Sequence, residues 1–139
     1  MTTIQKTRNL VWIGGDNFNM SGKIIRIKKS LERDVDLFNT ASEGIQGLYF
    51  SIYPLIFITD MLAPGDFNNS DNPQYELISK QVIENVRKIN TYKTTPIIVT
   101  GFPGGTIITE DYLEAGATEF FNFRGSNDTF IKSLQEYLR

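Results

Sequence analysis

Short apolar runs alternate five times with segments of helical periodicity in this chain of 139 residues, and this alternation restricts the fold more than any other feature. The apolar runs span residues 9–13, 34–40, 55–59, 95–100 and 118–123. Each is short and ends at glycine, asparagine or another turn-forming residue, as strands do. The sequence therefore predicts five strands, with a helix after each.

The intervening segments repeat apolar residues every three or four positions, which is the spacing of a helix with one buried face. These predicted helices span residues 20–31, 41–53, 73–90, 108–115 and 126–138. Alternating strands and helices form a parallel sheet covered on both faces, because each right-handed crossover must lie against one face. We therefore expect an α/β fold, a flavodoxin-like (βα)5 doubly wound sheet in three layers with strand order 2-1-3-4-5.

The third predicted strand, residues 55–59, is apolar or β-branched throughout and runs into Asp60. An unbroken run of this kind is typical of a central strand buried on both faces. Ligands of such sheets bind beyond the carboxyl ends of the strands near the switch point, which lies here between strands one and three. Asp16 follows strand one, so the two carboxylates are expected to meet there. The structural alternative is that Asp60 only caps a turn or the next helix.

Composition excludes several classes of function. The chain has 14 basic and 16 acidic residues and a formal net charge of −2, which gives no electrostatic reason to expect binding to nucleic acid or to a membrane. It contains no cysteine and no histidine, which excludes thiolate and imidazole catalysis by its own residues. We expect one cytoplasmic domain spanning residues 1–139, with no output domain.

Four segments together resemble the receiver domains of two-component signalling. They are ASEGIQGL at residues 41–48, PLIFITDMLAPG at 54–65, TPIIVTG at 95–101 and EAGATEFF at 114–121. The resemblance covers nearly the whole chain. It implies that Asp60 is the phosphoacceptor, that Thr100 is the switch hydroxyl and that Phe120 is the aromatic switch. It also implies that Asp16, Asp60 and the backbone carbonyl of Leu62 bind Mg²⁺, a metal that takes hard oxygen ligands.

Two positions depart from the receiver pattern. Gly15 stands where receivers carry their first acidic residue, and Phe123 stands where they carry a lysine, with Arg124 next to it. Metal and ammonium charge normally neutralise the phosphoryl group during transfer. Without them, we expect slow phosphorylation or weak coupling to the surface, unless Arg124 replaces the lysine as a cation.

Three interpretations follow. In the first, the chain is a stand-alone receiver that takes a phosphoryl group from a histidine kinase or phosphotransfer protein, and signals through the face of the fourth helix, fifth strand and fifth helix. In the second, equally supported, it is a pseudo-receiver that docks proteins without phosphorylation. In the third, it is a flavodoxin-like binder of a small molecule or nucleotide, with residues 101–105 holding a phosphate.

Some expectations are common to the receiver interpretations. Ordinary catalysis is not expected, because receivers assist only their own phosphorylation and dephosphorylation, here at Asp60. A homodimer through the last helices is left open. The aromatic residues Tyr49, Phe50 and Tyr53 are expected to pack against the sheet rather than to form an exposed patch, because helices on a sheet bury such side chains more often than they display them.

Overall fold

The computed structural model describes residues 8–14, 18–60, 62, 65, 75–101, 109–122 and 127–138. Five parallel strands form one sheet in the order β2-β1-β3-β4-β5. The strands are β1 (Leu10–Ile13), β2 (Val35–Phe38), β3 (Ile56–Thr59), β4 (Ile97–Gly101) and β5 (Glu119–Asn122). The predicted α/β class, strand order and parallel direction are confirmed.

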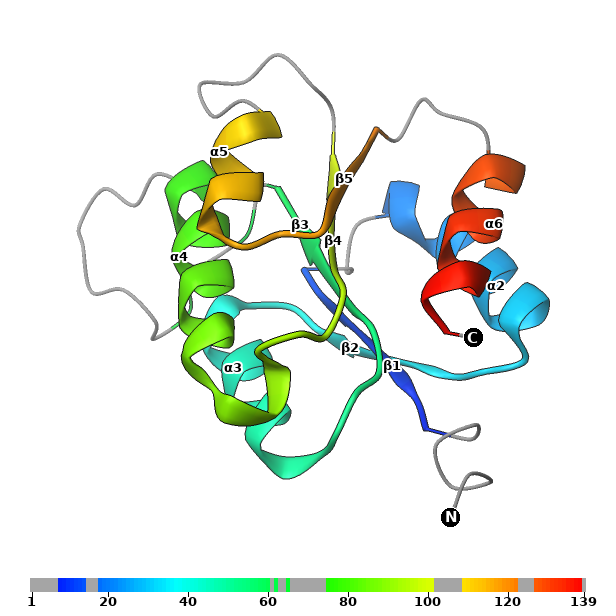
Figure 1. Ribbon diagram of the computed structural model, residues 1–139. Helices are drawn as coiled ribbons and strands as arrows, with labels where there is room; N and C mark the ends of the chain where they lie inside the picture. Colours follow the sequence, from blue (N-terminus) through cyan, green and yellow to red (C-terminus); the bar gives the residue numbers. More distant parts are fainter. Residues whose placement is uncertain are drawn as a thin grey trace.

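A helix follows each strand along the chain. The helices are α2 (Phe18–Leu31), α3 (Ala41–Phe50), α4 (Tyr75–Lys88), α5 (Thr109–Ala115) and α6 (Asn127–Tyr137), and a short 3-10 turn, η2 (Asn90–Tyr92), follows α4. Helices α3, α4 and α5 cover one face of the sheet, and α2 and α6 cover the other (Figure 1). In the described ranges, no helix is long and apolar enough to cross a lipid bilayer.

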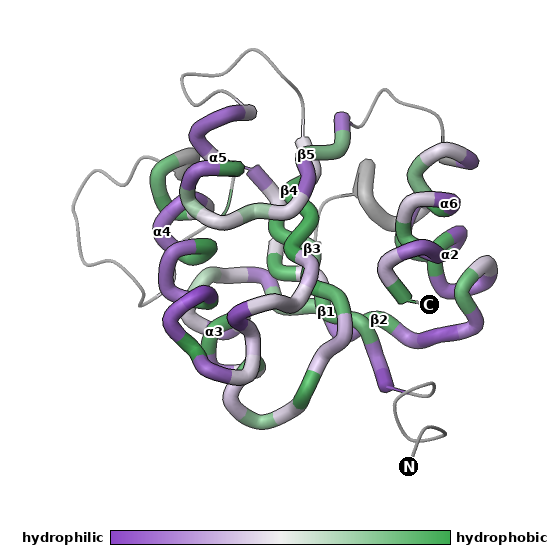
Figure 2. The backbone as a smooth tube through the Cα atoms, viewed as in Figure 1, coloured by the Kyte–Doolittle hydropathy of each residue, from purple (hydrophilic) through white to green (hydrophobic). Residues whose placement is uncertain are grey.

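Burial follows the strand order. Every residue of β1, β3 and β4 is buried, whereas β2 and β5 at the two edges alternate or are only partly buried. Figure 2 shows hydrophobic residues concentrated in the central strands and hydrophilic residues on the outer faces of the helices. The three central strands are covered on both faces, which explains why their sequences are apolar without alternation.

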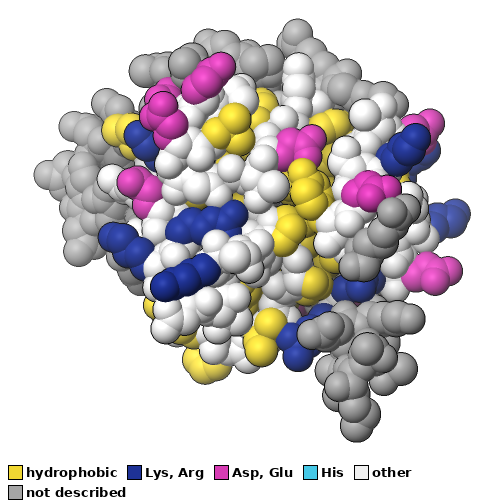
Figure 3. Space-filling model, viewed as in Figure 1, with side chains coloured by type: hydrophobic (Ala, Val, Ile, Leu, Met, Phe, Trp, Pro, Cys, Tyr) yellow, Lys and Arg dark blue, Asp and Glu magenta, His cyan; other side chains and the backbone are white. Residues whose placement is uncertain are grey.

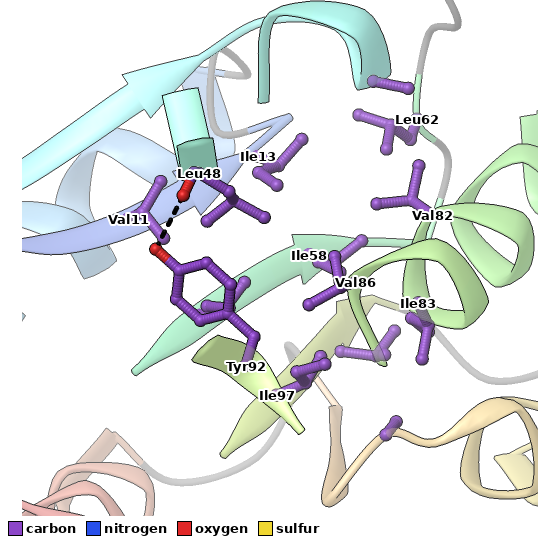
Figure 4. Close-up of a cluster of buried hydrophobic side chains, with 14 of the residues drawn as sticks. Val11, Ile13, Leu48, Ile58, Leu62, Val82, Ile83, Val86, Tyr92 and Ile97 are labelled. Carbon is purple, nitrogen blue, oxygen red and sulfur yellow. Dashed lines mark hydrogen bonds between the residues drawn. The ribbon is translucent and has the colours of Figure 1, made fainter. Parts of the chain in front are cut away.

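The two faces of the sheet have separate cores. Under α3, α4 and α5, the core includes Ile58, Val82 and Tyr92, and Figure 4 shows these side chains in one cluster, with the Tyr92 hydroxyl directed at the Leu48 carbonyl. Under α2 and α6, the core is aromatic: Trp12 stacks on Phe57 with ring centroids 4.5 Å apart. Burial of this apolar area is the main favourable term in folding, at about 25 cal/mol per Å².

Two glycines let α3 lie close to the sheet. A Cβ atom on Gly44 would lie 2.6 Å from the Ile13 side chain, and one on Gly47 would lie 2.4 Å from the Phe38 ring. Glycine costs about 1 kcal/mol against alanine within a helix. Here the close approach of helix and sheet requires it, and the Thr40 hydroxyl accepts a hydrogen bond from the Glu43 N–H to cap the helix.

Helix α3 ends at Phe50, three residues before the predicted end, because Ser51 is extended. Tyr53 then turns inward and is 4 % exposed, as expected. The expectation of burial is wrong for Tyr49 and Phe50, which are 69 % and 80 % exposed. The helix presents its glycine face to the sheet, so its last two aromatic residues point to solvent.

Candidate functional site

The carboxyl ends of β1, β3 and β4 lie side by side at one edge of the sheet. Ile13 of β1 pairs with Ile58 of β3, and Thr59 of β3 pairs with Thr100 of β4. Because all three strands are parallel, whatever follows them emerges at the same place. Asp60 follows β3 directly and is therefore at the switch point predicted from the sequence.

The backbone and side chain of Asp60 are both placed by β4. The Asp60 N–H donates to the Thr100 carbonyl at 2.9 Å, which extends the ladder one residue beyond the strand. The carboxyl group lies over Gly101, where a Cβ atom would be 2.1 Å from the carboxyl carbon. Any side chain at position 101 would displace the carboxylate. Glycine at this position is therefore part of the site.

The Asp60 carbonyl is held from the opposite direction by α4. Ser79 is fully buried, and its hydroxyl lies 2.7 Å from the Thr59 carbonyl oxygen and 2.9 Å from that of Asp60. The Tyr112 hydroxyl on α5 also lies 3.5 Å from the Asp60 carbonyl oxygen. Ser79 was not among the residues predicted for the site, although a serine next to Ile78 within the apolar stripe of α4 was a usable signal.

Thr100 differs from every other buried polar side chain in the described part of the chain. It is 0 % exposed, and its hydroxyl oxygen has no hydrogen-bond partner. Its neighbour in register, Thr59, shows the usual arrangement: that hydroxyl donates to the Gly14 carbonyl at 3.0 Å and accepts from the Trp12 indole at 3.3 Å. A buried hydroxyl without a partner costs about 1–3 kcal/mol. The protein bears this free-energy cost next to Asp60, the candidate phosphoacceptor.

Phe120, the predicted aromatic switch, is half-buried on β5. Its ring stacks on Tyr112 of α5, with centroids 5.8 Å apart and planes 23° apart. Because Tyr112 also approaches the Asp60 carbonyl, one side chain contacts both the candidate acceptor residue and the candidate switch. The structure thus places Asp60 at the end of β3 and Phe120 on β5, the two strands that flank β4, which carries Thr100, and the predicted roles of the three residues stay predictions.

Leu62 returns to the core after the strand. Its side chain is 0 % exposed and packs with Ile58 and Val82 (Figure 4). The Leu62 side chain also leaves no room for a side chain at position 14, directly after β1, because a Cβ atom on Gly14 would lie 2.9 Å from it. Gly14 has a φ of 89°, a conformation that favours glycine. The predicted role of the Leu62 carbonyl in metal binding stays a prediction.

The described residues supply one part of the predicted Mg²⁺ site. Asp60 contributes a carboxylate, which is the hard oxygen donor that Mg²⁺ prefers. Asp16, Gly15, Phe123 and Arg124 lie outside the described residues. Within those residues no cluster of three His, Cys, Asp or Glu side chains is present. The chemistry of Asp60 therefore fits a metal that takes few protein ligands and keeps its waters, and the full ligand set stays a prediction.

One cation near β5 was not anticipated. The Lys23 ammonium on α2 lies 5.4 Å from the centroid of the Phe121 ring, and Phe121 is the partner of Thr100 across β4 and β5. Partial burial lowers the pKa of Lys23 from its ordinary value. Phe121 itself stacks on Phe130 with centroids 3.9 Å apart. A positive charge thus lies on the same face of the sheet as the Thr100 side chain.

Comparisons with known proteins identify the fold. No family model matches the sequence, and no curated protein matches it. Among solved structures, a two-component response regulator from Clostridium difficile superposes with a TM-score of 0.72 at 18% identity, covering 96% of this chain and 97% of that one. A chemotaxis response regulator from Vibrio cholerae gives 0.70 at 16% identity, covering 94% and 99%.

A third structure has a described metal. It is the receiver domain of a sensor histidine kinase from Pseudomonas aeruginosa, with a magnesium ion coordinated in its active-site cleft. Its TM-score is 0.69 at 15% identity, and the match covers 95% of this chain and 98% of that one. Together with the strand order and the position of Asp60, these likenesses show that the chain has the fold of a response regulator receiver domain.

Proposed function

We propose that this chain is a signalling receiver in which Asp60 accepts a phosphoryl group from the phosphohistidine of a histidine kinase or phosphotransfer protein. In this reaction the P–N bond of the donor breaks, a P–O bond forms to a carboxylate oxygen of Asp60, and the imidazole keeps the electron pair. The product is an acyl phosphate at the carboxyl end of β3. Thr100 and Phe120 then carry the change to the face formed by α5, β5 and α6.

The unpaired hydroxyl of Thr100 is the observation that carries this proposal. Buried polar groups in native proteins are almost always hydrogen-bonded, and an exception asks for an explanation. The exception here is on the strand whose last residue, Gly101, supports the Asp60 carboxyl group. A phosphoryl oxygen on Asp60 would give the Thr100 hydroxyl an acceptor. The phosphorylated state thereby recovers a cost that the unphosphorylated state bears.

Charge must be neutralised at the same place, because an acyl phosphate adds nearly two negative charges to the site. We propose that Asp16, Asp60 and the Leu62 carbonyl hold Mg²⁺, which supplies positive charge and orients the phosphoryl oxygens when bound. Lys23 on α2 adds a cation on the Thr100 side of the sheet.

Tyr112 gives the relay a physical path. Thr100 and Phe120 lie on adjacent strands but face opposite sides of the sheet, so a shift of Thr100 toward a phosphoryl group would reach Phe120 through the paired backbones of β4 and β5. Phe120 stacks on Tyr112, so movement of the ring alters the packing of α5 against β5. The surface formed by α5, β5 and α6 would then bind its downstream protein differently in the two states.

A constitutive docking module is the second candidate, favoured by Gly15 and Phe123 at positions where receivers carry an acid and a lysine. In that case the fold presents its surface to partners without phosphorylation. The third interpretation, a phosphate held by residues 101–105, gains less support. At Gly101 the space beside the backbone is filled by the Asp60 carboxyl group.

The deciding experiment is incubation with acetyl phosphate and Mg²⁺, followed by intact mass measurement. The proposal expects a mass gain of about 80 Da, one phosphoryl group. The gain should disappear in Asp60→Asn and persist in Asp34→Asn, a matched change at an exposed carboxylate before β2. Absence of the adduct in the native chain, or its persistence in Asp60→Asn, would contradict the proposal and leave the docking module.

A further inference from the structure

We propose that the free edge of β2 and the end of α3 form a surface that pairs two copies of this chain. We call it the α3–β2 surface and define it by Arg8, Asp36, Leu37, Glu43, Tyr49, Phe50 and Ile52. It is distinct from the Asp60 site, and the proposal goes beyond the proposed function and does not depend on it. The experiment on phosphorylation and the experiment on pairing can therefore contradict one proposal without contradicting the other.

Exposed apolar side chains are concentrated on this surface. Of the seven large apolar side chains that are exposed in the described ranges, Leu37, Tyr49, Phe50 and Ile52 lie on β2 and at the end of α3. Phe50, at 80 % exposed, is the most exposed of the seven. Figure 3 shows apolar atoms at the surface along the lower edge of the molecule, where α3 ends. Clustered apolar exposure of this kind marks interaction sites.

The surface is also hollowed on both sides of Phe50. A cavity of about 660 Å³ includes Arg8 in its lining, and a second cavity of about 420 Å³ includes Glu43. Asp36 and Phe50 line both cavities, so the two cavities adjoin and form one groove that includes an aromatic ring. The groove thus offers an exposed aromatic side chain that can insert into a partner, next to cavities that can accept a side chain of the partner.

The backbone of β2 is open along this groove. The carbonyls of Asp34 and Phe38 accept from Leu10 and Gly14 of β1. In a parallel ladder, alternate residues of a strand bond to the same neighbour. The N–H and C=O groups of Leu37 therefore point away from β1, and β2 is an edge strand with no further neighbour in the described sheet. An unpaired edge of this kind is a template for another strand.

The charges favour a second copy as the occupant. A two-fold interface places each residue of the surface against the same surface reversed, so it must be complementary to itself. The base Arg8 lines only the larger cavity, the acid Glu43 lines only the smaller one, and Phe50 lines both. Reversal brings each Arg8 toward the partner's Glu43 and the two Phe50 rings together. Neither Arg8 nor Glu43 forms an ion pair among the described residues.

The register of β2 supports the same conclusion. Pairing two β2 strands antiparallel about Leu37 sets Leu37 opposite its copy, with two reciprocal backbone hydrogen bonds. Asp36 then lies opposite the copy of Phe38, and no two acids face each other. Asp36 is already held by the Tyr53 hydroxyl at 2.6 Å and by Asn9 at 3.0 Å. The paired edges leave β5, at the other side of the sheet, uncovered.

Sedimentation equilibrium of the unphosphorylated chain tests the pairing. We expect a reversible monomer–dimer equilibrium that Phe50→Lys weakens by at least about tenfold, as for the central aromatic residue of an interface. Ile25→Lys is the matched control, because Ile25 is 64 % exposed on α2, outside the surface. A chain that stays monomeric at all concentrations, or a dimer that is equally sensitive to both variants, would overturn the proposal.

Two further variants test the arrangement. The chain has no cysteine, so Leu37→Cys introduces a single thiol. Cα atoms about 5.5 Å apart in a bonded antiparallel pair lie within disulfide range. We expect Leu37→Cys to form a covalent dimer on mild oxidation and Ile25→Cys to stay monomeric. Arg8→Glu and Glu43→Arg should each weaken the dimer, and the double variant should restore it; a double variant weaker than both contradicts the reversed alignment.

Discussion

The two ends of the sheet differ in one buried polar group, the Thr100 hydroxyl. At the amino ends of the strands, the Tyr92 hydroxyl is fully buried and lies 3.0 Å from the Leu48 carbonyl oxygen and 2.5 Å from that of Ser51. Arg87 donates to the carbonyls of Gly116 and Thr95 at 2.8 and 2.7 Å. At the carboxyl ends, the Thr100 hydroxyl is buried without a partner.

Under the proposed function, this difference separates structural polar groups from a functional one. Groups at the amino end connect segments that are distant in sequence, and their hydrogen bonds are complete in the resting protein. Thr100 contributes no hydrogen bond through its side chain to the resting fold, and it lies beside Asp60. A hydroxyl that is satisfied only in a second state of the protein biases the protein toward that state. The following predictions test whether the two ends differ in this way.

The largest effect is expected at Arg87. Its guanidinium also donates to the Tyr92 carbonyl at 2.8 Å, so Arg87→Met leaves at least three carbonyls without their charged donor. We expect the free energy of unfolding to fall by about 3 kcal/mol. Urea denaturation followed by the fluorescence of Trp12, which is buried, measures the change. The exposed neighbour gives the control, since Lys88→Met should leave stability nearly unchanged.

Removal of the Tyr92 hydroxyl should have a smaller effect of the same sign. Tyr92→Phe keeps the buried ring but leaves the Leu48 and Ser51 carbonyls without this donor. We expect a loss of about 1.5 kcal/mol in the same denaturation experiment. Tyr49→Phe, at an exposed ring, should cost almost nothing. Equal stability of the two variants would show that the hydrogen bonds at the amino end do not stabilise the fold.

Thr100→Val should raise the free energy of unfolding, where the two preceding substitutions lower it. Valine has the shape of threonine without the hydroxyl, so it removes an unpaired buried polar group, and we expect a gain of about 1 kcal/mol. Thr59→Val is the matched change on the adjacent strand, and there we expect a loss, because its hydroxyl bonds to Gly14 and Trp12. If Thr100→Val also destabilises the chain, the hydroxyl has a structural partner and the contrast between the two ends fails.

The smallest effect is a dependence on alkaline pH. Burial, followed by the hydrogen bond to Glu119 at 2.6 Å, raises the pKa of Tyr137 from 10.0 to about 12. The unfolded chain therefore loses this proton first, so the contribution of Tyr137 to stability is complete below pH 10 and is lost as the pH rises toward about 12. Across this pH range, the midpoint temperature of thermal unfolding should fall less steeply in Tyr137→Phe than in the unsubstituted chain. Identical slopes would contradict this assignment of the pKa shift.

Much of the fold was predictable because it depends on local pattern. The apolar runs at β1, β3 and β4 have no alternation because these strands are covered on both faces, and that property is written into consecutive residues. Position 60 was predictable for the same reason, since it follows such a run. The glycines of α3 were less informative. They argued weakly against a helix, and only the contacts with Ile13 and Phe38 show why they are needed.

By itself, the sequence determined the order of strands and helices and the position of Asp60, because periodicity and turn residues act over a few neighbouring positions. The tertiary structure decided which polar groups are paired. Whether Thr100 has a partner, whether Ser79 reaches the Asp60 carbonyl and whether Phe50 faces solvent all depend on residues distant in the chain. Pairing of polar groups and exposure of single side chains are properties of the packed chain, because they depend on contacts between residues that no local pattern brings together.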